Sequence, residues 1–375
     1  MLRAGPADVI AYAFYQVGYR PRESLVLIGI HGPRLRLGLV IRVDLPPRRY
    51  LRAVFQQQLD TLREFGHDAL MALVVSDAAP PPGSNPGDLP HRRLARDLRR
   101  QARRQGVGVQ DVIAVGDHSW RSYSCTEPSC CPPGGRPLAE VLAGRLATTM
   151  ICEGRVLAPD EASLVADVAP APPAAAGPGS AERAPAEPGS AGVPPVQRVF
   201  ADPDARVADA PALLQRWREL LAVREPSPGS PAEPSADLGW LGEALQDRWL
   251  RDAVLFTLVP GSGTAPEELL AGSDDAVLDG LLDQRPDPEL LERGRMLLSA
   301  VARSAPPGAR VEALALLAWM SWWAGDGARG RLLAGRALDD RPGHRLARLV
   351  DGLLRAGVAP GWAHGAAAAR VQRSG

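Results

Sequence analysis

In the first part of the chain, short apolar runs typical of strands alternate with segments whose apolar residues have helical spacing. This alternation predicts a layered α/β domain. Runs rich in Val, Ile and Leu, typical of buried strands, occur at 24–30, 35–45, 69–77 and 109–117. Apolar residues recur every three or four positions, as on one face of a helix, at 6–19, 48–65, 90–105 and 137–154. The first two strands are predicted to pair as a hairpin. The later alternation predicts a mixed, partly parallel sheet with flanking helices.

From residue 237 onward the apolar positions follow a helical period, which predicts an all-α domain. Its long helical segments are expected at 237–259, 288–305 and 309–357. Residues 325–342 resemble the second half of a tetratricopeptide unit, with a turn at Gly325 and Asp326 and a small Gly330 where two helices approach. Because the pattern covers about one unit, we expect helical hairpins rather than a repeat array.

Segments rich in Pro, Ala, Gly and Ser divide the chain into parts. Residues 167–195 and 225–237 have this composition and cannot bury a core, so we interpret them as linkers. Along the chain we predict an α/β domain at 1–158, a linker at 159–196, an all-α helical domain at 197–365 and a tail at 366–375.

Composition excludes several classes of function. The 43 basic residues balance 43 acidic ones, so the net charge gives no general attraction to nucleic acid or membranes. All the basic residues are Arg, and without Lys neither a pyridoxal-phosphate Schiff base nor the phosphate-binding loop GxxxxGK[ST] can form. No HExxH or GxSxG motif is present. Four cysteines and the lack of a signal peptide or membrane-length apolar run predict a cytoplasmic protein.

The segment SWRSYSCTEPSCCPPGGRP at 119–137 contains three of the four cysteines. Cys125, Cys130 and Cys131 could bind zinc, with His118 or Cys152 as a further ligand. The spacing is poor for zinc, because adjacent cysteines point apart on an extended chain. Cys125 and Cys130 could instead form a redox pair, or the thiols could pack as small apolar groups in a tight turn. The sequence leaves these three interpretations open.

Acidic residues lie near the ends of three of the predicted strands. Asp44, Asp77 and Asp117, the last followed by His118, lie where α/β sheets commonly build sites. They are our candidate catalytic residues, although acids at such positions also cap the following turn or helix.

The predicted helix at 90–105 carries a stripe of arginines. Its members are Arg92, Arg96, Arg99 and Arg103. We interpret this stripe as a solvated face, because no aromatic residues interleave with it to stack bases. We therefore expect no nucleic-acid partner.

Several stretches together resemble one family, the uncharacterised bacterial family catalogued as domain of unknown function 4192. They are GYRPRESLVLIGI at 18–30, RVDLP at 42–46, SWRSYSCTEPSCCPPGGRPL at 119–138, LRDAV at 250–254 and AWMSWWAGDGARGRLLAGRALDDRPGHRLARL at 318–349. The resemblance implies a cytosolic bacterial protein with an α/β region followed by a helical region, and no known activity. It also implies that one structural motif is formed by Trp120, Ser122, Cys125, Cys130, Cys131, Pro132 and Gly135.

Two functional hypotheses follow. In the first, the protein is a non-catalytic binding or regulatory module whose helical domain binds a protein partner. In the second, it is a metal- or thiol-dependent enzyme with a site at the strand ends beside the cysteine turn, and zinc is the candidate cofactor. The sequence favours the module, because no recognised catalytic constellation accompanies the cysteines. It does not determine the oligomeric state.

Overall fold

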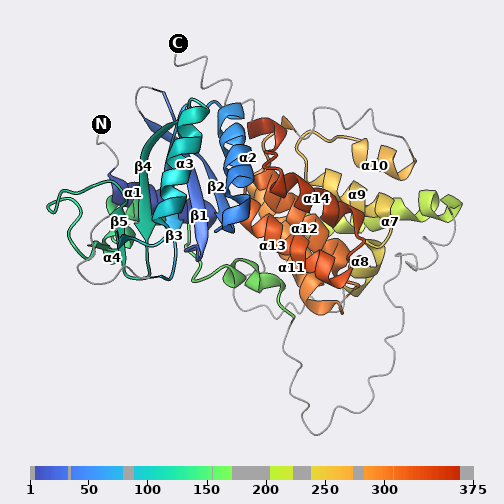
Figure 1. The fold of residues 1–375 in the computed structure, drawn as a ribbon. Helices are drawn as coiled ribbons and strands as arrows, with labels where there is room; N and C mark the ends of the chain where they lie inside the picture. The colour runs from blue at the N-terminus through green and yellow to red at the C-terminus, as the bar shows by residue number, and fades with distance from the viewer. Residues whose placement is uncertain are drawn as a thin grey trace, which may run out of the picture. The chain divides into compact units, whose positions relative to one another are not determined.

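The fold is seen in a computed structural model that describes residues 5–32, 35–78, 88–153, 155–170, 203–222, 238–272, 283–306 and 308–363. The chain forms two compact units that divide between Leu164 and Val165. The strands belong to the first unit, and the described part of the second is helical (Figure 1). Within these described ranges, no helix is both long and apolar enough to cross a membrane.

A six-stranded mixed sheet forms the centre of the first unit. Its strands are β1 (Ser24–His31), β2 (Arg36–Asp44), β3 (Ala69–Val75), β4 (Gly108–Val115), β5 (Ser119–Ser122) and β6 (Arg136–Pro137). They lie in the order β2-β1-β3-β4-β5-β6. β3 and β4 are parallel, and the other neighbours are antiparallel. The mixed, partly parallel sheet and the hairpin of the first two strands are therefore confirmed.

Helices cover both faces of this sheet. They are α1 (Pro6–Val17), α2 (Leu51–Glu64, preceded by the 3-10 turn η1, Arg48–Tyr50), α3 (Arg92–Arg104), α4 (Ala139–Leu142) and α5 (Arg145–Cys152). Val26 and Ile28 of β1 pack with α1, α4 and α5, whereas Leu25 and Leu27 pack with α2 and α3. Because both faces are covered, the central strands are apolar along nearly their whole length.

The second unit is built around one buried helix, α12 (Val311–Ala324). The other helices are α7 (Pro203–Ala222), α8 (Gly239–Ala244), α9 (Arg248–Thr257), α10 (Ala265–Leu270), α11 (Pro288–Ser304), α13 (Gly327–Asp340) and α14 (Arg345–Arg355). α12 is buried from Val311 to Trp323 and packs against α11, α13 and α14. Helices that are apolar on all sides occur only where neighbours surround them.

The hairpin of α12 and α13 forms as the sequence predicts. Gly325 adopts a φ of 84°, and the side chain of Asp326 accepts a hydrogen bond from the backbone of Arg329. A Cβ atom at Gly330 would lie 3.1 Å from the carbonyl oxygen of Ala318, so a small residue is needed there. The likeness to a tetratricopeptide unit is not confirmed beyond this hairpin.

Two predicted helices are wrong, because each is a pair of shorter helices. The segment 137–154 forms α4 and α5, which separate at Gly144, an extended residue that precedes α5. The segment 237–259 forms α8 and α9. Asp247 begins α9 by accepting hydrogen bonds from Trp249 N (2.8 Å) and Leu250 N (2.9 Å). Apolar periodicity runs through both breaks, so it could not reveal them.

Ordered structure extends into the segment predicted to be a linker. Residues Ala162–Val168 form the 3-10 helix η3. In the second unit, Asp167 accepts hydrogen bonds from Arg329 (Nη2, 2.8 Å) and Ser299 (Oγ, 2.8 Å) and pairs with Arg295. The remainder of the predicted linker at 171–196, the linker at 225–237 and the tail at 366–375 lie outside the described residues.

Candidate functional site

The cysteine turn is the connection between β5 and β6, and both of its ends are held by the sheet. Trp120 of β5 pairs with Arg136 of β6. At the start of the turn, Ser122 Oγ donates to Asp111 Oδ1 (2.9 Å) and accepts from the backbone of Cys125 (3.1 Å). Arg99 of α3 also donates to Asp111 (2.9 Å), so this member of the arginine stripe anchors the turn rather than facing only solvent.

The turn brings three thiols together. The Sγ atoms of Cys125, Cys130 and Cys131 all lie within 4.8 Å of one another. Adjacent Cys130 and Cys131 do not diverge as they would on an extended strand. Both backbone N–H groups donate to the carbonyl of Glu127, at 3.2 and 2.8 Å, and the chain curves around them.

The three thiols differ in exposure, and none of them forms a disulfide in the structure. Cys130 is exposed, Cys125 is half-buried and Cys131 is buried. Burial and the neighbouring Cys125 thiol raise the pKa of Cys131 to about 11, although a hydrogen bond from the Ser122 backbone opposes the shift. Without a bound cation, Cys131 is therefore a neutral thiol at physiological pH.

The geometry of the three sulfurs fits zinc with a small adjustment. A tetrahedral site with Zn–S bonds of about 2.3 Å places its sulfurs about 3.8 Å apart. The observed limit of 4.8 Å requires each pair to close by about 1 Å at most. Among the described residues, neither His118 nor Cys152 joins this group. His118 lies in the turn before β5, and Cys152 is exposed at the end of α5.

The three acidic candidates lie at one edge of the sheet, each beside an arginine. In the register, Ser24 is opposite both Asp44 and Val75, and Val75 is opposite Val115. Asp77 and Asp117 each lie two residues beyond these last two residues, Val75 and Val115. The ion pairs are Arg42–Asp44 (2.7 Å), Arg22–Asp77 (2.7 Å) and Arg20–Asp117 (3.0 Å). The edge thus carries three acid–arginine pairs instead of a ring of free carboxylates.

Sequence reasoning missed a hydrogen-bonded chain at the same edge. Ser76 Oγ lies 2.8 Å from Glu23 Oε1 and 3.1 Å from His91 Nε2. Glu23 and His91 have φ values of 39° and 57°, in the left-handed region that side chains disfavour. Such strain is commonly stored at functional sites. The position of Ser76 after β3 was the available signal, and nothing in the sequence marked Glu23.

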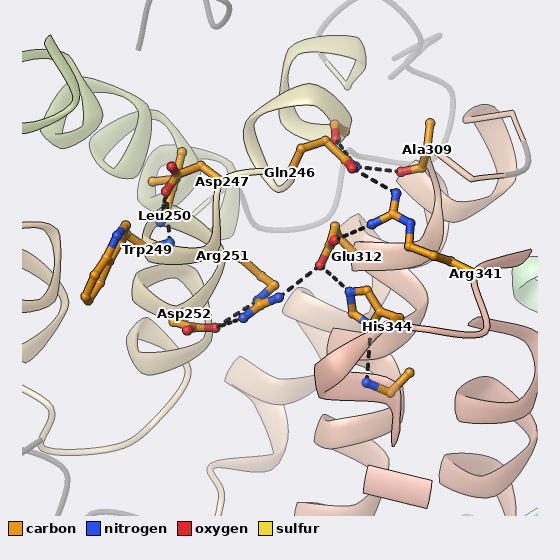
Figure 2. Close-up of polar contacts among 12 residues, drawn as sticks. Gln246, Asp247, Trp249, Leu250, Arg251, Asp252, Ala309, Glu312, Arg341 and His344 are labelled. Atoms are coloured by element: carbon orange, nitrogen blue, oxygen red, sulfur yellow. Dashed lines mark hydrogen bonds and ion pairs between the residues drawn. The ribbon is translucent and has the colours of Figure 1, made fainter. Parts of the chain in front are cut away.

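A second polar cluster, also missed, lies inside the helical unit. Figure 2 shows the buried carboxylate of Glu312 with donors from α9 and from the connection between α13 and α14. Arg341 Nη1 donates to Oε1 (3.0 Å), while Arg251 Nη1 (3.1 Å) and His344 Nε2 (2.8 Å) contact Oε2. His344 Nδ1 accepts from Ala347 N (3.2 Å), so the proton of its neutral ring is on Nε2. Because the carboxylate is fully paired, we interpret this cluster as structural.

Comparison with known proteins places the chain in a family. A family model described as Domain of unknown function (DUF4192) matches residues 6–361. The chain belongs to the DUF4192 family. This confirms the resemblance found in the sequence, and the family description assigns no activity. No curated protein and no solved structure matches the chain. The matched part of this DUF4192 chain includes the cysteine turn, the acid–arginine edge and the Glu312 cluster.

The seven residues expected to form one motif in the DUF4192 chain all lie on the β5–β6 hairpin or its turn. Trp120 is buried, and the guanidinium of Arg136 lies 5.9 Å from the centre of its ring. Pro132 accepts a hydrogen bond from the backbone of Gly135 (2.9 Å), which closes the turn after the cysteines. The hairpin thus gives the cysteines a fixed support.

Proposed function

We propose that this DUF4192 protein binds a zinc ion through Cys125, Cys130 and Cys131. The observation that carries the proposal is the convergence of three thiol sulfurs on a turn that the sheet holds at both ends. Thiolate sulfur is a preferred zinc ligand, and three protein ligands leave the fourth position to water or another ligand.

The surroundings of the thiols suit this cation. Zinc binds thiolates, so it must displace the proton of Cys131, and its affinity rises with pH. Three thiolates and one Zn²⁺ carry a net charge of about −1. Arg136 interacts electrostatically with Cys130 and Cys131 and would offset that charge.

The zinc site supports a binding or regulatory module rather than an enzyme. In such a module the metal stabilises the hairpin, and partner binding through the helical unit remains our prediction. The alternative is a metal- or thiol-dependent enzyme that uses the fourth position to activate water. It needs a free base near the metal. Asp44, Asp77 and Asp117 are each engaged by an arginine, which favours the module.

Native mass spectrometry of protein purified without chelators, combined with a count of reactive thiols, tests the proposal. We expect one zinc per chain and protection of three cysteines. Cys130→Ser should lose the metal, since it removes a ligand at an exposed position without disturbing the core. Cys152→Ser is the matched control, because Cys152 is also exposed but lies outside the group.

Two outcomes would contradict a zinc site. Four reactive thiols and no bound metal would show that the cysteines only pack as small apolar groups in the turn. A mass two hydrogens lighter, restored by a reductant, would identify a redox pair between two of the cysteines. Either result would also remove the basis for the enzyme alternative that depends on metal.

A further inference from the structure

Two neighbouring helices, α2 and α3, cover one face of the sheet (Figure 1). Their apolar sides pack into the same core cluster. Gln56 of α2 accepts hydrogen bonds from Gln101 of α3 (3.0 Å) and from Gln105, which follows α3 directly (2.7 Å). The polar sides of the two helices therefore lie next to each other and form one outer surface, which we call the α2–α3 face.

The α2–α3 face carries a large excess of positive charge. Residues 48–64 and 92–104 contain eleven arginines but only three acids, although the chain as a whole is neutral. Ten of these eleven arginines are exposed, six of them on α3. The rest of the chain carries the compensating excess of acids, so this surplus reflects a separation of charge and not only the general abundance of arginine.

Few of these charges are neutralised within the described part of the chain. Arg63 and Arg100 pair with acids of their own helices at 3.8 and 3.5 Å, and exposed pairs of this kind are weak. Among the described residues, Arg93, Arg96 and Arg103 have no ion-pair partner. Their guanidinium groups are available to a ligand, and the planar fork of donors matches the geometry of a phosphate group.

The make-up of this face favours a nucleic acid over a folded protein or a membrane. Protein interfaces usually bury an apolar centre, and helices that lie on membranes insert an apolar side. The structure describes every residue of α2 and α3, and none of their large apolar side chains is exposed, because the apolar sides pack on the sheet. A phosphate backbone needs no apolar contact, since arginines bind it and release its counterions.

An exposed aromatic ring adjoins this face. In the sequence no aromatic residue interleaves with the arginines of α3, which favours a solvated face. The fold changes this balance, because it places α2 and its preceding turn in the same surface. Tyr50 at the start of α2 is 51 % exposed, and the guanidinium of Arg49 lies 4.8 Å from the centre of its ring. Exposed rings in a basic surface stack on unpaired bases.

We propose that the α2–α3 face binds the phosphate backbone of a nucleic acid without reading its sequence. Arginines of both helices supply the phosphate contacts, and Tyr50 offers a stacking surface to an unpaired base. This inference goes beyond the zinc proposal and does not depend on a bound metal.

Fluorescence anisotropy of labelled DNA tests this with the full-length protein. We expect two unrelated sequences to bind equally well in about 50 mM NaCl. If about four arginines contact phosphates, the affinity for duplex DNA should fall roughly 100-fold as NaCl rises from about 50 to about 200 mM. Tighter binding of a single strand would identify stacking on Tyr50, and tighter binding of the duplex would identify backbone contacts alone. Both results support the proposal.

Charge reversals locate the binding face. Arg93→Glu combined with Arg96→Glu should weaken binding at least tenfold. Arg345→Glu combined with Arg348→Glu is the matched control and should leave binding unchanged. These two arginines of α14 are also exposed and three residues apart, and the change in net charge is the same. Circular dichroism shows whether each variant folds, and Arg103→Glu repeats the test if the first variant does not.

Four results would overturn the proposal. Neither form of DNA binds at low salt, or the variants of α3 and α14 lose affinity equally. Poly-glutamate competes as well as DNA of equal charge, which would assign the face to an acidic protein segment. Vesicles that contain phosphatidylserine bind while DNA does not, which would assign it to a membrane surface.

Discussion

Glu312 shows how a single buried charge is accommodated in the helical unit. Burial alone would raise the pKa of its carboxyl group, but the hydrogen bond from His344 and the charge of Arg251 outweigh it, and the pKa is lowered. Asp252 has the opposite balance, since burial raises its pKa despite the contact with Arg251. The contributions of the two acids to stability therefore change with pH in opposite directions. Only for Glu312 does the ionised form stabilise the fold.

We expect Glu312→Gln to lower the free energy of unfolding by about 3–5 kcal/mol at pH 7, because it leaves the buried Arg251 and His344 without their anion. The contribution of Glu312 is fully present above its unfolded pKa, near the ordinary value of 4.5 for a glutamate, and is lost as the pH falls through the lower folded pKa. Urea denaturation at neutral and acidic pH measures both effects.

Glu219→Gln is the matched control for this change, since Glu219 makes an exposed pair with Arg216. Surface pairs contribute about 0–1 kcal/mol, so this variant should unfold nearly as the wild type does. A difference between wild type and Glu312→Gln that stays constant down to acidic pH would refute the role given to the ionised carboxylate.

Among the elements, the β5–β6 hairpin connects the fold to the proposed zinc site. Gly134 and Gly135 have φ values of 100° and 78°, which side chains disfavour. A Cβ atom at Gly135 would also lie 2.9 Å from the carbonyl oxygen of Trp120. The return of the chain to the sheet after the cysteines therefore requires glycine.

Gly135→Ala should destabilise the first unit by about 1–3 kcal/mol through backbone strain, and it should reduce the zinc content. Gly335→Ala in α13 is the control, because a methyl group there meets no atom within 4 Å and alanine favours a helix. Thermal melts and metal analysis of both variants give the answer. Full zinc content in a destabilised Gly135→Ala would show that the cysteines converge without this turn.

Elements were predictable where local pattern determines them. The Val-, Ile- and Leu-rich strands were found because both faces of the sheet are covered, and the α12–α13 turn was found from Gly325 and Asp326. The breaks at Gly144 and Asp247 were missed, since apolar periodicity continues across them. Strand order was also out of reach, because it depends on pairing between distant segments.

The candidate site was predictable only in part, for a similar reason. The sequence placed Asp44, Asp77 and Asp117 at strand ends, and they do share one edge. Their arginine partners come from other segments: Arg20 and Arg22 precede β1. The convergence of Cys130 and Cys131 depends on a backbone turn at Glu127, which cysteine spacing does not encode.

At the scale of the whole molecule, the chain consists of two units with separate cores. In the first unit, clusters on the two faces of the sheet supply apolar burial, and in the second α12 is surrounded by its neighbours. The chain enters the second unit at Val165, where η3 attaches through Asp167 to α11 and α13. The division between the two compact units therefore lies before the Pro-rich segment.

We expect fragments 1–164 and 165–375 each to unfold cooperatively. A shorter fragment, 203–375, should be less stable than 165–375 by at least about 1 kcal/mol, because it lacks the contacts of Asp167 with Ser299 and Arg329. Chemical denaturation followed by circular dichroism compares them. Asp167→Asn in the longer fragment should reproduce most of the loss, and equal stability of the two fragments would show that η3 contributes nothing.

The burial of α12 on all sides has a consequence during synthesis. Its covering helices α13 and α14 come later in the chain and end at Arg355, about 30 residues after α12 ends at Ala324. At typical translation rates of about 5–20 residues per second, the ribosome needs about 2–6 s to synthesise these residues. During those seconds α12, which has no polar face, is not yet fully covered by its neighbouring helices. The nascent chain then displays the kind of apolar segment that chaperones bind, and folding of this unit cannot finish before α14 has emerged.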